Sequence, residues 1–174
     1  MGLAARAAGA GMNVCILQFV KAKKPKPGKT RQTGEWPISN EFNYFDAKTK
    51  SKDLGKIDYA QLGSGFVGIL GDKKERKTHI IAAKEGLAMA RKIIKSGKYQ
   101  LVILDELISA LELKLLTEKE ILSLIKNKPL ALHLAYTGHD HFDRIVSVSD
   151  LVSDIVMIKH PYYSGMLAQR GIDY

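Results

Sequence analysis

The chain has 174 residues, of which 45% are hydrophobic and 26% are charged, and its formal net charge is +9. This length and composition suit one soluble globular domain, over residues 1–174, with a full core. No apolar run approaches the length that spans a bilayer, so the composition excludes an integral membrane protein and we expect no membrane partner.

Positive charge gathers in two places. Six positive residues fall between Lys21 and Arg31, and a second group runs from Lys73 to Lys77. Such patches can hold phosphate-rich ligands or nucleic acid. No aromatic residue interleaves the first group, as a nucleic-acid platform would require. We therefore interpret it as a solvated loop and expect no nucleic-acid partner.

Cys15 is the one cysteine, so no internal disulfide can form. This fits a reducing compartment, and we expect a cytoplasmic protein. Its neighbours Val14 and Ile16 indicate a buried strand. We interpret Cys15 as an inert core thiol rather than a nucleophile.

Helices are predicted at four places. The Ala-rich segment at the start of the chain ends at Gly9 and Gly11. A second, longer segment has apolar residues at helical spacing and ends at Gly97. Thr117 with Glu120 three residues on forms a capping box. We expect helices at 2–10, at 74–96, from 117 onward, and at 140–148.

Strands are predicted where apolar residues run together between these helices, and residues 21–37 are predicted as a loop because they contain three Pro and two Gly. We expect strands at 13–20, 42–46, 56–62, 99–104, 130–136 and 151–159. Alternating strands and helices, with apolar strands throughout, predict an α/β fold with a mostly parallel sheet covered by helices on both faces.

Asp105 and Glu106 follow directly on the apolar residues 101–104. Ligands of such sheets bind beyond the carboxyl ends of the strands. An apolar strand that ends in two acids is the Walker B pattern, whose carboxylate holds Mg²⁺ against nucleotide phosphates. The alternative is a helix N-terminus whose acids complement the helix dipole.

Thr137, Gly138 and His139 end the next expected strand. His139 and His141 are two residues apart, which is a poor zinc signal without nearby cysteine. Gly28-Lys29-Thr30 imitates the end of a Walker A motif, but the glycine that the motif requires earlier is Lys23 here, and prolines surround it. We interpret it as a loop without phosphate-binding function.

Short motifs along the whole chain resemble, in order, those of the P-loop ATP:corrinoid adenosyltransferases, the cob(I)yrinic acid a,c-diamide adenosyltransferases. The matching segments are residues 2–9, Gln18-Phe19-Val20-Lys21, Gly34-Glu35-Trp36, Gly65-Phe66, Leu104-Asp105-Glu106-Leu107, Thr137-Gly138, and Lys159-His160-Pro161 with Gly165, Ala168, Gln169 and Gly171.

This resemblance implies a RecA-like P-loop fold, a homodimer, and transfer of the adenosyl group of ATP to the cobalt of a reduced corrinoid, with triphosphate released in adenosylcobalamin formation. It implies ATP, Mg²⁺ and corrinoid as ligands, and allows a flavoprotein reductase as partner. Glu106 would hold Mg²⁺, and Arg6, Asp105 and Thr137 would lie near ATP.

Gly65 and Phe66 would face the corrinoid under the same resemblance. Phe66 would press on the corrin face and make Co(II) easier to reduce. The alternatives are that Phe66 anchors the core and that Arg6 is a solvated helix residue. With Gly65 preceding it, an aromatic side chain on such a loop can approach a flat ligand.

The sequence departs from the family at three points. The first strand and its Gly-x-x-x-x-Gly-Lys-Thr loop are missing, Gly68 stands where the family has Trp, and His139 stands where the family has Arg. We expect the 174-residue chain to bind ATP poorly. Two alternatives to an adenosyltransferase remain: a non-catalytic corrinoid-binding remnant, and a basic P-loop ATPase or nucleic-acid-binding fragment.

Overall fold

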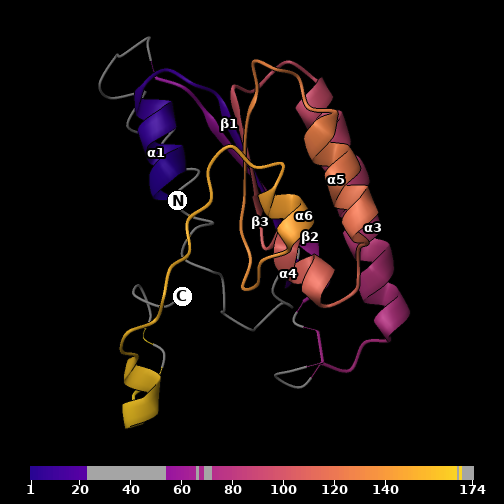
Figure 1. Ribbon diagram of the computed structural model, residues 1–174, viewed down its shortest axis with the longest axis vertical. Coiled ribbons are helices and arrows are strands. Elements are labelled where there is room, and N and C mark those ends of the chain that lie inside the picture. The colour runs from indigo at the N-terminus through magenta and orange to yellow at the C-terminus, as the bar shows by residue number, and fades with distance from the viewer. Residues whose placement is uncertain (23–53, 66, 69–71, 168, 170–174) are drawn as a thin grey trace, which may run out of the picture.

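The computed structural model describes residues 1–22, 54–65, 67–68, 72–167 and 169 (Figure 1). The four strands of these described residues form one sheet in the order β2-β1-β3-β4. Their bounds are Val14–Ala22 for β1, Ile57–Gly63 for β2, Leu101–Asp105 for β3 and His133–Tyr136 for β4. Every neighbouring pair is parallel. The expected α/β fold with a parallel sheet is confirmed.

The helices of the described residues cover both faces of this sheet (Figure 1). Their bounds are Gly2–Gly9 for α1, Arg76–Lys95 for α3, Leu107–Glu112 for α4, Glu118–Lys126 for α5 and Asp143–Val146 for α6, with a 3-10 turn at Pro161–Ser164. None of them combines the length and apolarity that crossing a bilayer requires.

Alternating side chains of β1 and β3 separate the core into two layers. Val14 and Ile16 pack against the small residues of α1, together with Leu101 and Ile103. Their neighbours along the strands face the layer of α3, α4 and α5 instead, namely Cys15, Leu17, Phe19, Val102 and Leu104. Because strand side chains point alternately to the two faces, a run of apolar residues requires cover on both sides.

The predicted helices are present with shifted ends. Thr117 and Glu120 form the expected capping box, because the Thr117 side chain accepts from the Glu120 N–H and the Glu120 carboxylate accepts from the Thr117 N–H at 2.8 Å. The helix predicted at 140–148 is present only as α6, and α4 was not predicted. The expected loop at 21–37 and strand at 42–46 lie outside the described residues, except that Lys21 and Ala22 belong to β1.

The strand predicted at 151–159 is wrong. This segment has no strand or helix assignment, and Leu151, Ile155 and Ile158 are 86%, 93% and 91% exposed. An apolar run forms a strand only where its backbone finds a neighbour with which to pair, and no described strand lies beside it. Figure 1 shows the segment running away from the sheet toward the C-terminus.

Candidate active site

A chain of polar side chains crosses the carboxyl ends of the strands. Gln18 of β1 is paired in register with Gln61 of β2 and with Asp105 of β3. Thr137 follows β4 directly. Parallel strands bring their carboxyl ends to one edge, where ligands of open α/β sheets bind.

Gln18 is the centre of this chain although it is only 1% exposed. Its Nε2 donates to Oδ2 of Asp105 at 2.7 Å. Its Oε1 accepts from the Tyr59 hydroxyl and from Nε2 of Gln61, the latter at 3.2 Å. A buried amide is costly unless it is paired, so these bonds stabilise Gln18 and fix the position of the Asp105 carboxylate.

Thr137 joins the end of β4 to both acids. Its hydroxyl donates to Oδ1 of Asp105 at 2.8 Å and accepts from the backbone N–H of Glu106 at 3.0 Å. Its carbonyl accepts from the N–H of Ile108 at 3.0 Å. Both Asp105 oxygens therefore accept hydrogen bonds from protein side chains, and the turn into α4 is held against β4.

Glu106 has a left-handed backbone, with φ 60° and ψ 23°, at the position that precedes α4. Non-glycine residues adopt this conformation rarely, and they concentrate at functional sites. Its carboxylate makes no capping bond to α4. Oε2 instead accepts from the Ser109 hydroxyl, and Oε1 lies 4.0 Å from Nε2 of the exposed His139. Because Glu106 precedes the first turn of α4, the alternative that its charge complements the helix dipole stays open beside the metal-binding interpretation.

Gly138 gives the turn after β4 its close approach to α4. A Cβ at this position would lie 2.5 Å from Cβ of Ile108 and 2.7 Å from the backbone N of Ser109. No side chain fits this gap unless α4 moves. The glycine after Thr137 thus permits the contact that places Glu106 beside Thr137.

The donor set fits a magnesium ion that is shared with a ligand. Among the described residues, no group of three or more His, Cys, Asp or Glu side chains is placed to hold a metal by itself. Magnesium is usually held in nucleotide sites by one or two carboxylates together with substrate phosphates. Glu106, with Asp105 beside it, supplies oxygen donors of this kind.

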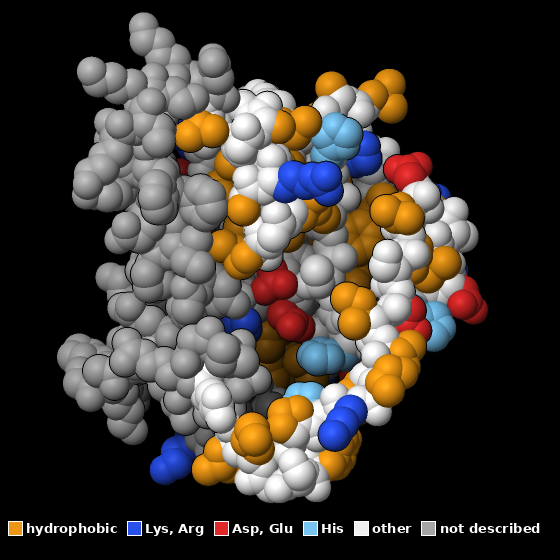
Figure 2. Space-filling model, turned by 90° about the vertical axis from the view of Figure 1, so that its left-hand side faces the viewer, with side chains coloured by type: hydrophobic (Ala, Val, Ile, Leu, Met, Phe, Trp, Pro, Cys, Tyr) orange, Lys and Arg blue, Asp and Glu red, His pale blue; other side chains and the backbone are white. Residues whose placement is uncertain are grey.

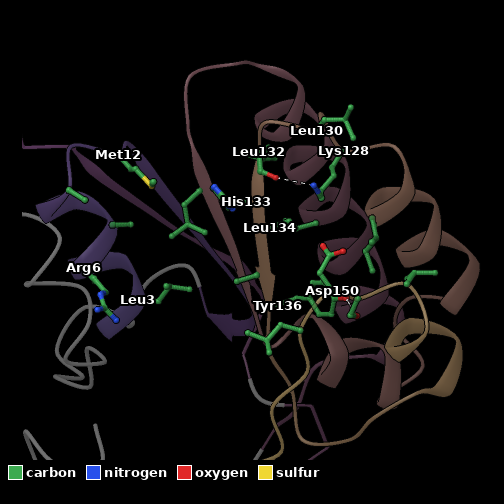
Figure 3. Close-up of a pocket in the computed structure, with 18 residues that line it drawn as sticks. Leu3, Arg6, Met12, Lys128, Leu130, Leu132, His133, Leu134, Tyr136 and Asp150 are labelled. Atoms are coloured by element: carbon green, nitrogen blue, oxygen red, sulfur yellow. Dashed lines mark hydrogen bonds between the residues drawn. The ribbon is translucent and has the colours of Figure 1, made fainter.

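Arg6 lies apart from this cluster. It is exposed on α1 and lines a cavity of about 770 Å³ that runs along β4, together with Leu3, His133, Tyr136 and Asp150 (Figure 3). Neither Asp105 nor Glu106 lines this cavity. The role of Arg6 near the phosphates stays a prediction.

Gly65 follows β2 and Ser64 with φ 123°, so it occupies a backbone region that favours glycine. Phe66 lies outside the described residues. One face of the molecule is hollowed, with acidic and histidine side chains grouped in the hollow and apolar side chains around it (Figure 2).

Comparison with known proteins identifies the family of the chain. The family model described as ATP:corrinoid adenosyltransferase BtuR/CobO/CobP matches residues 1–174. The chain belongs to this family.

Curated relatives named corrinoid adenosyltransferase are similar to the chain over nearly all of its length. A corrinoid adenosyltransferase of Pseudomonas aeruginosa is 27% identical over 173 residues, which cover 99% of this chain and 75% of that protein. The corrinoid adenosyltransferase of Escherichia coli K12 is 26% identical over 173 residues, covering 99% and 76%. One from Sinorhizobium is 26% identical over 166 residues, covering 94% and 68%.

The structure of this family member adds residues that the sequence did not single out for a role. Tyr59, Gln61 and Ser109 bond to Gln18 or Glu106. Gln18 could be noticed in the sequence, because it is the polar residue inside an apolar run. The structure shows that it is buried. The other three are ordinary polar residues until the register of the strands is known.

Proposed function

We propose that this chain transfers the 5′-deoxyadenosyl group of ATP to the cobalt of a reduced corrinoid. The cobalt of the substrate is the nucleophile: a cobalt–carbon bond forms at C5′, the bond from C5′ to the triphosphate oxygen breaks, and triphosphate leaves with the electron pair. The protein must therefore orient two substrates and stabilise the leaving charge. The observation that carries the proposal is the network joining Gln18, Asp105, Glu106 and Thr137 at the carboxyl ends of the strands.

Within this reaction Glu106 would hold Mg²⁺. Thr137 would fix the backbone of Glu106, and Asp105 and Thr137 would lie on the nucleotide side of the site. The support is that Asp105 already accepts two hydrogen bonds whereas Glu106 keeps Oε1 toward the exposed His139. When bound, the ion would neutralise charge on the triphosphate. Gly65 and Phe66 remain the proposed corrinoid-facing residues.

The phosphate-binding strand of such a site would pair with β4, which has a described neighbour only on its β3 side. The cavity lined by Arg6, Leu134 and Asp150 follows the other side of β4 (Figure 3). Neighbouring strands lie about 4.8 Å apart, so a strand added here would fill this space and cover exposed Leu151. A parallel strand in that place that leads into α1 would bring Arg6 toward the bound phosphates.

We further propose a cytoplasmic homodimer of single-domain subunits that works with a flavoprotein reductase. The single buried Cys15 fits a reducing compartment. Cobalt must be reduced before it can act as a nucleophile, so a reductase would have to supply the electron.

The test is an anaerobic assay with chemically reduced cob(I)alamin and Mg·ATP. It compares the 174-residue chain with the same chain preceded by a segment that carries Gly-x-x-x-x-Gly-Lys-Thr. The extended chain is expected to release adenosylcobalamin and triphosphate in equal amounts, and the shorter chain to do so much more slowly. Corrinoid binding without transfer would indicate a non-catalytic family member. Formation of ADP and phosphate without adenosylcobalamin would indicate an ATPase.

A further inference from the structure

His79 is a buried histidine that the adenosyl transfer site does not use. It lies in the first turn of α3 and is 3% exposed. Both ring nitrogens are bonded: Nδ1 lies 2.8 Å from the hydroxyl of Ser64, and Nε2 lies 2.9 Å from Oδ2 of Asp72. A buried imidazole with two fixed partners is rigid, and it links two parts of the backbone.

The Asp72 carboxylate accepts hydrogen bonds from three groups. Oδ2 also accepts from the backbone N–H of Gly68 at 2.9 Å, and Oδ1 accepts from the N–H of Lys74 at 3.1 Å. The hydrogen bonds from Gly68 and Lys74, followed by the effect of His79, hold the pKa of the Asp72 carboxyl below its ordinary value. An ionised Asp72 accepts only, so Nε2 of His79 donates to it, while Nδ1 shares a hydrogen bond with the Ser64 hydroxyl.

Through His79, these hydrogen bonds connect the two ends of the segment between Ser64 and Asp72. Ser64 directly follows β2, and Asp72 lies four residues before α3. Lys74 adds a further tie, because its ammonium donates to the carbonyl of Ser64. Gly65 and Phe66 lie between the two closed ends in the sequence.

The order Ser–His–Asp is also that of hydrolytic triads, but the contacts here differ from theirs. In a serine hydrolase Nε2 faces the serine and Nδ1 faces the acid. Here Nδ1 faces Ser64 and Nε2 faces Asp72, and the ring is buried. The hydrogen bonds of His79 instead connect the chain at Ser64 with the chain at Asp72.

We propose that His79 is a positioning residue: by bonding Ser64 and Asp72 it fixes the backbone at Gly65 and Gly68, and so sets the affinity for the corrinoid substrate. The second half of this inference rests on the proposed function. The first half concerns the fold alone and is tested separately.

Hydrogen exchange by NMR on the 174-residue chain tests the clamp made by Ser64, His79 and Asp72. In the wild type we expect the amides of Gly68 and Lys74 to be protected, with the His79 ring in the Nε2–H form. His79→Ala and the milder Ser64→Ala should each lower this protection at least tenfold. In Asp72→Asn one of the two amides loses its acceptor whichever way the side-chain amide turns.

Thr117→Ala is the matched control, because it removes the cap of α5 and lowers global stability without touching the clamp. Protection of Gly68 and Lys74 should stay unchanged in this variant, whereas protection of the core of β3 should fall with the global stability. Equal protection in Ser64→Ala, His79→Ala and the wild type would overturn the clamp, as would an Nδ1–H form of the ring.

Equilibrium dialysis against cob(II)alamin tests the link to the substrate. Ser64→Ala and His79→Ala should weaken binding at least fivefold, and Thr117→Ala should leave it unchanged. Unchanged binding in the two clamp variants would overturn the positioning role. Failure of the wild type to bind cob(II)alamin would overturn the proposed function, while the exchange data would still decide whether the clamp exists.

Discussion

The hydroxyl of Thr137 lies 2.8 Å from Oδ1 of Asp105, so the residue after β4 holds the acid at the end of β3. The same hydroxyl accepts from the backbone N–H of Glu106 at 3.0 Å. One side chain therefore fixes both the Asp105 carboxylate and the left-handed turn that presents Glu106. We therefore expect Thr137 to act through these two neighbours.

Thr137→Val removes the hydroxyl and keeps the shape of the side chain. We expect adenosyl transfer by the chain extended with a phosphate-binding segment to fall roughly 10–100-fold, as is typical when a partner that orients a metal ligand is lost. Thr137 is exposed, so the free energy of unfolding should fall by no more than about 1.5 kcal/mol. Thr137→Ser should restore most of the activity. A Val variant with wild-type kcat would contradict the positioning role.

Gly138→Ala introduces a methyl group where 2.5 Å separates it from Cβ of Ile108. Because α4 must move to accept it, we expect a loss of about 1–3 kcal/mol in the free energy of unfolding. Activity should fall with it, since Glu106 precedes α4. Gly9→Ala is the control, because a Cβ there meets nothing within 4 Å, and stability should hold or rise. Denaturant unfolding of both variants measures the difference, and equal stabilities would refute the close contact.

Much of the fold could be predicted from the sequence because its signals are local. Thr117 and Glu120 lie three residues apart, and the apolar period of α3 lies within one helix. The strand predicted at 151–159 failed because a strand depends on a neighbour that no local pattern reveals. Helix α4 has six residues, too few for a period to be recognised.

The candidate site likewise has a part that local sequence signals reveal and a part that depends on long-range contacts. Asp105 and Glu106 stood out because an apolar strand ends in two acids. The bond from Gln18 to Asp105 joins residues 87 positions apart, and that from Tyr59 to Gln18 joins residues 41 apart. Such contacts follow from the register of the sheet. The bonds of His79 likewise depend on how α3 packs beside the end of β2.

Cys15 should resist alkylation in the folded protein. Burial, with a smaller contribution from the charge of Asp58, raises the pKa of its thiol to about 12. The reactive thiolate is therefore scarce, and iodoacetamide at pH 8 should react roughly 1,000-fold more slowly than with the unfolded chain. Mass spectrometry with and without denaturant measures both rates, and similar rates would contradict the burial of this strand.

The raised pKa of the Cys15 thiol also makes the stability of the protein depend on pH. The unfolded thiol, with its ordinary pKa of 9.0, loses its proton before the folded one does. The stabilisation is therefore complete below pH 9 and is lost as the pH rises from 9 toward about 12. Cys15→Ala should show a weaker loss of stability over this alkaline range, and an identical pH profile would contradict it.

Phe66→Ala separates a corrinoid site from a general nucleotide site. If Phe66 presses on the corrin face, its loss should impair adenosylation that starts from cob(II)alamin. Transfer to chemically reduced cob(I)alamin should suffer much less, because that cobalt no longer needs to be reduced. Equal losses with both substrates, or no loss with either, would reject Phe66 as a corrin-facing residue. The comparison uses the chain extended with a phosphate-binding segment.

The proposed function requires that Glu106 hold the Mg²⁺ that would neutralise charge on the triphosphate of ATP. The decisive measurement is the rate of adenosylcobalamin formation by Glu106→Gln, in the extended chain, over a range of Mg²⁺ concentrations. Gln keeps the size of the side chain and its oxygen toward Ser109, so the melting temperature should change little. We predict at least a 100-fold loss of turnover that excess Mg²⁺ does not restore. Turnover at the wild-type rate with an unchanged Mg²⁺ dependence would contradict the account.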